Sequence, residues 1–150
     1  MRVVVQRVKE ASVTVSEKII GLIDHGLVVF VSFVDDDTMD DLDWMSKKII
    51  NLRIFRDKDD KMNDSLLDID GNILLISQFT LHASTKKGNR PSFIKAAKPD
   101  FANDMYQKFI ELFEKYLGKS IQTGEFGADM KVGLVNDGPT TIIIDSRDRE

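Results

Sequence analysis

Two polar segments of the sequence carry residues that could take part in chemistry. The first, Ser77-Gln78-Phe79-Thr80, follows directly on the aliphatic run 73–76. The second is the stretch 136–141, Asn-Asp-Gly-Pro-Thr-Thr, near the other end of the chain. Hydroxyl and amide groups at the end of a buried strand need hydrogen-bond partners, because an unpaired buried polar group costs roughly 1–3 kcal/mol. They are satisfied either in the core or by a ligand, and the presence of the second segment favours a ligand.

The rest of the sequence offers few catalytic groups. There is no cysteine, which excludes disulfides, zinc-thiolate sites and a thiol nucleophile. The two histidines are His25, in a predicted turn, and His82, two residues after Thr80, and no cluster has metal-ligand spacing. Ser77 or Thr80 with His82 is not a triad, because neighbours on an extended strand point in different directions. Backbone donors and hydroxyls remain, and they suit an activated ester, where one N–H facing the oxyanion supplies roughly 2.7–4 kcal/mol.

A basic segment lies between these two polar stretches. Residues 86–98 contain five cations and no acid, namely Lys86, Lys87, Arg90, Lys95 and Lys98. The segment is therefore +5, which leaves −9 on the rest of a chain whose net charge is −4. A basic patch on an acidic body suits contact with a short part of a polyanion. The alternative is a solvated loop whose lysines keep it soluble and bind no partner. On charge alone, this alternative is favoured over a binding patch.

The elements that must position these groups are mostly strands. Apolar runs and β-branched residues predict about eight of them. They cover residues 3–15, as a hairpin broken at Lys9-Glu10, then 19–23, 26–34, 53–55, 73–81, 130–135 and 140–144, with Gly138-Pro139 turning the chain between the last two.

Two helices complete the prediction. Thr38 is placed to cap the first, and apolar residues then recur at spacings of three and four. They are Leu42, Met45, Ile49 and Leu52. Pro99 opens the second helix, and Gly118 ends it. The acids Asp35-Asp36-Asp37 lack the spacing of a calcium loop and are interpreted as helix-start chemistry.

The sum is a mixed α/β fold with both helices packed on one side of the sheet, in a single domain of residues 1–150. The longest apolar segment, residues 27–34, is too short to span a membrane, and no signal peptide is visible. We therefore expect a soluble protein.

Taken together, the motifs resemble the D-aminoacyl-tRNA deacylase family along essentially the whole chain. The match runs through Gln6-Arg7-Val8, Ala11-Ser12-Val13, Arg53-Ile54-Phe55, Ser77-Gln78-Phe79-Thr80-Leu81, Arg90-Pro91-Ser92-Phe93, Thr123-Gly124 with Phe126 and Met130, and Asn136-Asp137-Gly138-Pro139. The resemblance implies a layered β/β/α fold and a homodimeric, cytoplasmic editing enzyme without cofactor or metal. Such an enzyme cleaves the ester that joins a D-amino acid, or glycine, to the terminal adenosine of tRNA.

The resemblance also implies roles for single residues. Ser77, Gln78 and Met130 would bind the substrate, and the backbone N–H groups of Phe79 and Thr80 would face its carbonyl oxygen. Catalysis would use the 2′-hydroxyl of the terminal ribose, with the Thr80 hydroxyl as a nucleophile kept as the alternative, although no base is evident to activate it.

Chiral selection would come from the other polar segment. Gly138 and Pro139 of the partner subunit, joined by a cis peptide, would enter the pocket and exclude L side chains, with Arg7 fixing their orientation. Backbone atoms placed in this way clash with a side chain in the L configuration only. Glycine has no side chain, so it would not be excluded. The chain has Thr140 where the family usually has valine.

Lys86, Lys87 and Arg90 are candidates for tRNA contact. The main rival is a binding module that recognises the tRNA end or another nucleotide without chemistry, and a structural dimer with no ligand is a third hypothesis. The pairing of segment 77–80 with Gly138-Pro139 speaks against both, because a passive binder does not need it.

Overall fold

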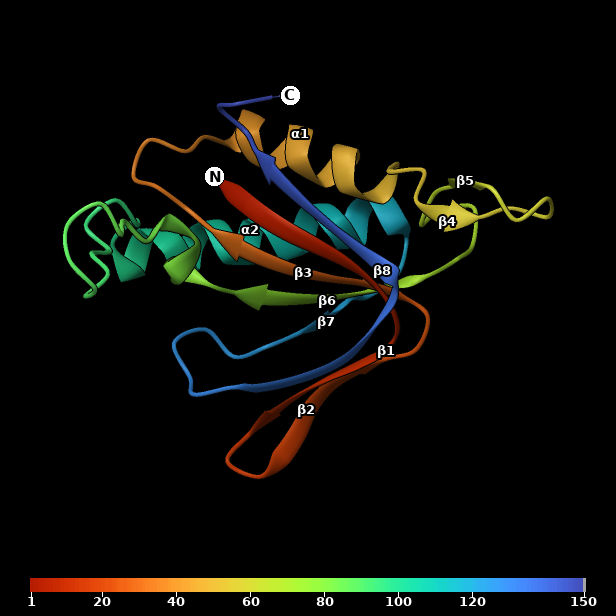
Figure 1. Cartoon of the computed structure of the whole chain (residues 1–150), viewed down its shortest axis with the longest axis horizontal. Helices are drawn as coiled ribbons and strands as arrows, with labels where there is room; N and C mark the ends of the chain where they lie inside the picture. Colours follow the sequence, from red (N-terminus) through yellow and green to blue (C-terminus); the bar gives the residue numbers. More distant parts are fainter. Residues whose placement is uncertain (150) are drawn as a thin grey trace.

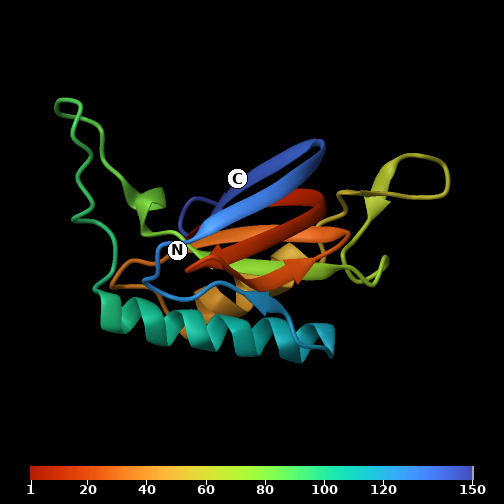
Figure 2. The same ribbon diagram turned by 90° about the horizontal axis from the view of Figure 1, so that it is seen from below.

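The computed structural model describes residues 1–149 and consists of a curved sheet with both helices on one side (Figure 1 and Figure 2). The strand order is β2-β1-β3-β6-β7, and β8 also pairs with β1, while β4 and β5 form a separate small sheet. The strands are β1 (Arg2–Val15), β2 (Lys18–Ile23), β3 (Gly26–Ser32), β4 (Phe55–Arg56), β5 (Met62–Asp64), β6 (Asn72–Ser77), β7 (Gln122–Thr123) and β8 (Lys131–Asp145). The helices are α1 (Met39–Ile50) and α2 (Pro99–Leu117), and η1 (Phe79–His82) is a 3-10 turn.

Two hydrophobic cores lie on opposite faces of the central strands. The larger core packs Leu27, Val29 and Leu75 against the helices, whereas Val28 and Leu74 join a second core under β2 and the far half of β1. Because β3 and β6 are buried on both faces, their sequences read as continuous apolar runs. The predicted mixed α/β class, the two helices and their position on one side are confirmed.

The predicted hairpin over residues 3–15 is wrong, because β1 is one continuous strand. Its first half pairs with β3 and its second half with β2, and β8 pairs with both halves. Lys9 and Glu10 are exposed next to register shifts between β1 and β8. The polar pair therefore marks an irregularity where the strand passes from one core to the other, not a turn.

The strand predicted over 73–81 is shorter than expected. β6 ends at Ser77, and the chain then forms the 3-10 turn η1. The reason is a change of partner, because β6 runs parallel to β3 only as far as the end of that strand, and Gln78 N–H donates to Val31 O at 2.7 Å. Leu81 N–H then donates to Gln78 O at 3.1 Å, which closes the turn.

Gly138-Pro139 does not turn the chain between two strands, because β8 runs along β1 on both sides of it. Thr141 pairs with Gln6 and Asn136 pairs with Val8, so residues 137–140 stand opposite Arg7 alone. These four residues form a bulge in β8. The Gly138–Pro139 peptide bond within it is cis, and both residues are exposed.

The remaining strand predictions differ in their bounds. β4 begins at Phe55 instead of Arg53, and it pairs with the unpredicted β5, whose three residues are too short and polar to stand out in the sequence.

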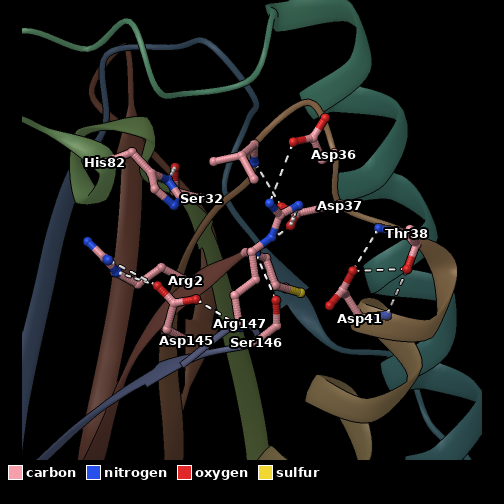
Figure 3. A network of polar contacts seen from close by, with 12 residues as sticks. Arg2, Ser32, Asp36, Asp37, Thr38, Asp41, His82, Asp145, Ser146 and Arg147 are labelled. Carbon is pink, nitrogen blue, oxygen red and sulfur yellow. Dashed lines mark hydrogen bonds and ion pairs between the residues drawn. The ribbon is translucent and has the colours of Figure 1, made fainter. Parts of the chain in front are cut away.

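The start of α1 is as predicted. The Thr38 hydroxyl accepts from Asp41 N–H and the Asp41 carboxylate accepts from Thr38 N–H, which makes a capping box (Figure 3). The acids before it are more than helix-start chemistry. Asp35 accepts from Lys98 N–H at the start of α2 (3.1 Å), and buried Asp37 pairs with the Met1 amino group at 2.5 Å.

α2 begins at Pro99 and ends at Leu117, and Gly118 follows as its C-cap with φ +68°, the left-handed conformation that favours glycine at a helix end. Among residues 1–149, neither helix has a stretch long and apolar enough to cross a membrane.

Candidate active site

A cavity of about 550 Å³ opens where β3 and β6 end. Its walls come from segments far apart in the sequence: the ends of these two strands, the second half of the loop before α2, the start of α2, and the segment 126–132. Four residues predicted from the sequence line it, namely Ser77, Gln78, Phe79 and Met130. The cavity is bounded mainly by apolar side chains, so it suits a ligand with a flat or apolar part.

Gln78 lines this cavity, whereas Thr80 is not among the lining residues and contacts Gln78 through its hydroxyl group. Gln78 Nε2 donates to the Thr80 hydroxyl oxygen at 2.5 Å. Among the described residues no imidazole or carboxylate is hydrogen-bonded to the Thr80 hydroxyl. Within residues 1–149, a general base for a threonine nucleophile is therefore not in place.

Two backbone donors are available at the start of η1. Hydrogen bonds in a 3-10 turn join residues three apart, so the N–H groups of Phe79 and Thr80 have no acceptor inside the turn. Within residues 1–149 no acceptor outside the turn is found for either group. The Phe79 side chain is 57% exposed and meets the ring of Phe93 edge-on, with centroids 5.1 Å apart.

The turn η1 is held from behind by β1 and β3. Ser32, the last residue of β3, has its Oγ 3.3 Å from the Phe79 carbonyl oxygen. The same Oγ lies 2.7 Å from His82 Nδ1, and Figure 3 shows the two side chains next to each other. Arg2 Nη1 donates to Leu81 O at 2.9 Å, and its Nε donates to Asp145 at 3.1 Å. The motif is thus fixed through its carbonyl groups.

His82 is a buried member of this support, 9% exposed. Burial, and then the positive charges of Arg2 and the Met1 amino group, lower the pKa of His82 below its usual range, against the opposing effect of Asp37 and Asp145. The imidazole is consequently neutral near pH 7. Burial by itself would raise the pKa of Asp145, but the Arg147 N–H and Arg2 lower it below its ordinary value.

Met130, which lines the cavity, lies directly over a glycine. A Cβ at Gly124 would overlap Met130 Sδ and approach Ile76 Cδ1 to 3.1 Å. Gly124 N–H in turn donates to Leu75 O at 3.0 Å. The methionine can therefore line the cavity only because position 124 has no side chain.

Gly138, Pro139 and Arg7 do not line the cavity of their own chain. Arg7 is buried, 2% exposed, below the bulge of β8. Its Nε donates to Asp137 O at 3.0 Å and lies 3.6 Å from the Asp137 carboxylate, and its Nη1 donates to Ile54 O. Arg7 and the bulge are thus brought together, but apart from the Ser77–Thr80 motif.

Lys86, Lys87 and Arg90 are all exposed on the loop between η1 and α2. This loop projects from the body at the end opposite to the β4–β5 loop (Figure 2). Its first half carries these three cations, and its second half, which also contains Lys95 and Lys98, lines the cavity with Phe93, Ala96 and Ala97.

Sequence reasoning did not identify Ser32 as a site residue. The available signal was that Ser32 is the one polar residue inside the apolar run 27–34. Phe93 and Phe126, quoted above only as parts of motifs, also line the cavity. No group of three or more metal-ligating side chains that could hold an ion occurs among residues 1–149.

Comparison with known proteins gives a consistent result. A family model described as D-Tyr-tRNA(Tyr) deacylase matches residues 4–145. The D-aminoacyl-tRNA deacylase of Flavobacterium johnsoniae is 61% identical over 150 residues, and that of Flavobacterium psychrophilum is 58% identical, each with 100% of both chains covered.

Two solved structures have the same fold. One, described as a c-Myc DNA unwinding element binding protein, is 41% identical with a TM-score of 0.92, over 97% of this chain and 98% of that one. The other, described as a probable eukaryotic D-amino acid tRNA deacylase, has a TM-score of 0.83 over 95% and 97% of the two chains. At 18% identity the second likeness concerns the fold alone.

Proposed function

Since the chain belongs to the D-Tyr-tRNA(Tyr) deacylase family and is a D-aminoacyl-tRNA deacylase, a hydrolase, we propose that its cavity receives the terminal adenosine of tRNA with the attached amino acid. The observation that carries this assignment of the site is the pair of N–H groups of Phe79 and Thr80, which have no acceptor within residues 1–149 and start a turn whose first residue, Phe79, lines the cavity of about 550 Å³. A volume of this size suits a nucleoside with a small acyl group.

The two N–H groups stabilise the negative charge that develops on the substrate's carbonyl oxygen. A water molecule attacks the carbonyl carbon, the ester bond to the ribose oxygen breaks, and that oxygen leaves with a proton. One well-placed donor supplies roughly 2.7–4 kcal/mol to such a step. Ser77, Gln78 and Met130 hold the substrate, which supplies proximity.

The 2′-hydroxyl of the terminal ribose assists the attack in place of a protein side chain. The support for this role is that the described residues of the site offer no side chain placed to act as nucleophile and base. Thr80 is hydrogen-bonded to Gln78 instead of a base, and the imidazole of His82 is turned towards Ser32.

D-selectivity comes from Gly138 and Pro139 of a partner subunit, positioned by Arg7. Both residues are exposed on a bulge that does not line its own cavity, so they are free to enter another. Their backbone excludes an L side chain and leaves room for a D side chain, whereas glycine has no side chain to exclude. Glycyl-tRNA is therefore also a substrate.

This arrangement needs a homodimer, and the tRNA substrate places the enzyme in the cytoplasm. Exposed apolar residues on the outer sides of β2 and β8 are available for a subunit contact, among them Ile19, Leu22 and Ile143. Lys86, Lys87 and Arg90 on the projecting loop contact the phosphates near the tRNA end.

The experiment that tests this function is hydrolysis of D-tyrosyl-tRNA, L-tyrosyl-tRNA and glycyl-tRNA by the purified protein. We expect rapid release from the D ester and from glycyl-tRNA, with the L ester spared. If both chiral esters are cleaved alike, the Gly138-Pro139 filter is wrongly placed. If none is cleaved by folded, dimeric protein, the chain is a non-catalytic module that binds the tRNA end.

A further inference from the structure

We propose that Ser32 and His82 are positioning residues that orient the peptide group between Phe79 and Thr80, and with it the N–H group that Thr80 presents to the substrate. This inference rests on the function proposed above. Neither residue reacts with the substrate, and both act through the backbone of η1.

The peptide group between Phe79 and Thr80 is planar, which couples the directions of its two polar groups. The Phe79 carbonyl and the Thr80 N–H belong to one peptide unit, which is trans, so the two groups point in opposite directions. Ser32 Oγ holds the carbonyl from the side of β3 at 3.3 Å. Fixing the carbonyl on that side fixes the direction of the N–H on the other side.

His82 determines which way the Ser32 hydroxyl points. A serine hydroxyl has a single proton, and when this proton is donated to the Phe79 carbonyl it cannot also go to His82. The 2.7 Å contact must then be a hydrogen bond from His82 Nδ1–H to Ser32 Oγ. The result is a chain of donors that runs from His82 to Ser32 to the Phe79 carbonyl.

The surrounding structure holds this series of hydrogen bonds in place. His82 and Ser32 are both buried, and the turn that carries His82 is also held by Arg2 through Leu81 O at 2.9 Å. Polar side chains inside the apolar run of β3 are costly unless paired, and Ser32 is paired on both sides. A preorganised donor loses less of its stabilising effect to reorientation than one on a free loop.

The test compares steady-state and single-turnover kinetics on D-tyrosyl-tRNA with affinity for a D-aminoacyl-adenosine analogue that has an amide in place of the ester. Ser32→Ala is expected to lower kcat by roughly 10- to 100-fold, as a small misplacement of a catalytic group does. Affinity for the analogue stays unchanged. Ser32→Thr keeps the hydroxyl and is expected to keep most of the activity.

His82 is tested by the same readouts. His82→Phe is expected to lower kcat as Ser32→Ala does, and His82→Asn to restore part of it, because an asparagine amide can donate from nearly the position of Nδ1. When residues act through one series of hydrogen bonds, the effects of their substitutions on kcat do not add. The double variant Ser32→Ala with His82→Phe should therefore be no slower than Ser32→Ala alone.

A matched control separates positioning from a general loss of stability. Ser46 is a fully buried serine whose hydroxyl donates to Leu42 O at 2.7 Å inside α1, away from the cavity. Ser46→Ala should lower the unfolding midpoint about as much as Ser32→Ala and leave kcat unchanged.

Three outcomes would overturn the inference while the proposed function stands. The first is an equal fall in kcat for the Ser46 control, and the second is additive effects in the double variant. The third is a Ser32→Ala defect that appears as weaker binding of the analogue, which would mean that Ser32 contacts the substrate directly. Inactivity of the unaltered protein would instead remove the proposed function, and this inference with it.

Discussion

The guanidinium of Arg7 ties the middle of β1 to the bulge of β8, because its Nε donates to Asp137 O at 3.0 Å. The same side chain donates to Ile54 O just before β4. One buried cation thus connects three segments far apart in the sequence. The planar, forked group of arginine suits such a site, whereas a lysine ammonium does not.

Arg7→Lys is therefore expected to lower the free energy of unfolding by about 1.5–3 kcal/mol and to weaken D-over-L selectivity. Urea unfolding and paired hydrolysis of the two tyrosyl esters measure these effects. Arg53→Lys is the control, because Arg53 is exposed and donates to Asn63 O at 2.9 Å away from the bulge. If the two variants have the same D-over-L selectivity, Arg7 does not contribute to the proposed exclusion of L side chains.

Gly138→Ala tests the bulge itself. Gly138 has φ +133°, and an added Cβ would lie 2.6 Å from Thr140 Oγ1 and 2.9 Å from Arg7 Nη2. We expect a loss of about 1–3 kcal/mol in stability and a fall in D-over-L selectivity. Gly133→Ala in the same strand is the control, since its Cβ would meet only Ser12 Oγ at 3.4 Å. Wild-type selectivity in Gly138→Ala would contradict the proposed filter.

Thr80→Ala should keep substantial activity, because the group proposed to act is the backbone N–H, which the substitution retains. The side chain removed is an acceptor for Gln78 Nε2. Single-turnover hydrolysis of D-tyrosyl-tRNA measures the effect, with Thr80→Ser as the variant that keeps the hydroxyl. Nearly complete loss of turnover with unchanged substrate affinity would restore Thr80 as the nucleophile.

The buried histidine predicts a pH dependence of stability. Because the pKa of His82 is lowered in the folded chain, below about pH 6.5 the unfolded chain takes up a proton that the folded chain does not. Stability should therefore fall from about pH 6.5 downward until the folded-state pKa is passed. Urea midpoints at pH 7.5 and 5.5 should differ less for His82→Asn than for the unaltered protein. An unchanged difference would assign the effect to other groups.

Charge removal on the projecting loop tests whether this loop binds tRNA. Lys86→Gln with Lys87→Gln should weaken tRNA binding and reduce the slope of log affinity against log salt by about 1 for each phosphate that is no longer neutralised. Lys58→Gln with Lys61→Gln removes the same charge from the β4–β5 loop at the other end of the molecule, where both lysines are exposed. Equal slopes in the two double variants would mean that the basic loop does not touch the tRNA.

The parts of the fold that the sequence predicts are those governed by local rules. Thr38 caps α1 through a contact three residues away, and the runs of β3 and β6 reflect burial on both faces. The continuous β1 is different, because Lys9-Glu10 has the composition of a turn and only the pairing with β8 keeps it extended. Likewise, the end of β6 at Ser77 depends on where β3 ends.

The candidate site divides in the same way. Ser77, Gln78, Phe79 and Met130 were recognisable because they belong to motifs, and the cavity brings them together. Ser32 belongs to no motif, and its role depends on a contact with His82 fifty residues away. Such a contact leaves almost no signal in a single sequence.

The spacing of the two halves of the site along β1 has a genetic consequence. Ser32, behind η1, pairs with Arg2, whereas the bulge stands opposite Arg7, roughly 17 Å further along the strand. If the bulge of one subunit completes the pocket of the other, a chain carrying Gly138→Ala and a chain carrying a pocket defect at Gln78 each lack a different half. Mixed dimers would then contain one intact pocket facing one intact bulge, so two alleles that each fail alone would restore selective hydrolysis when expressed together.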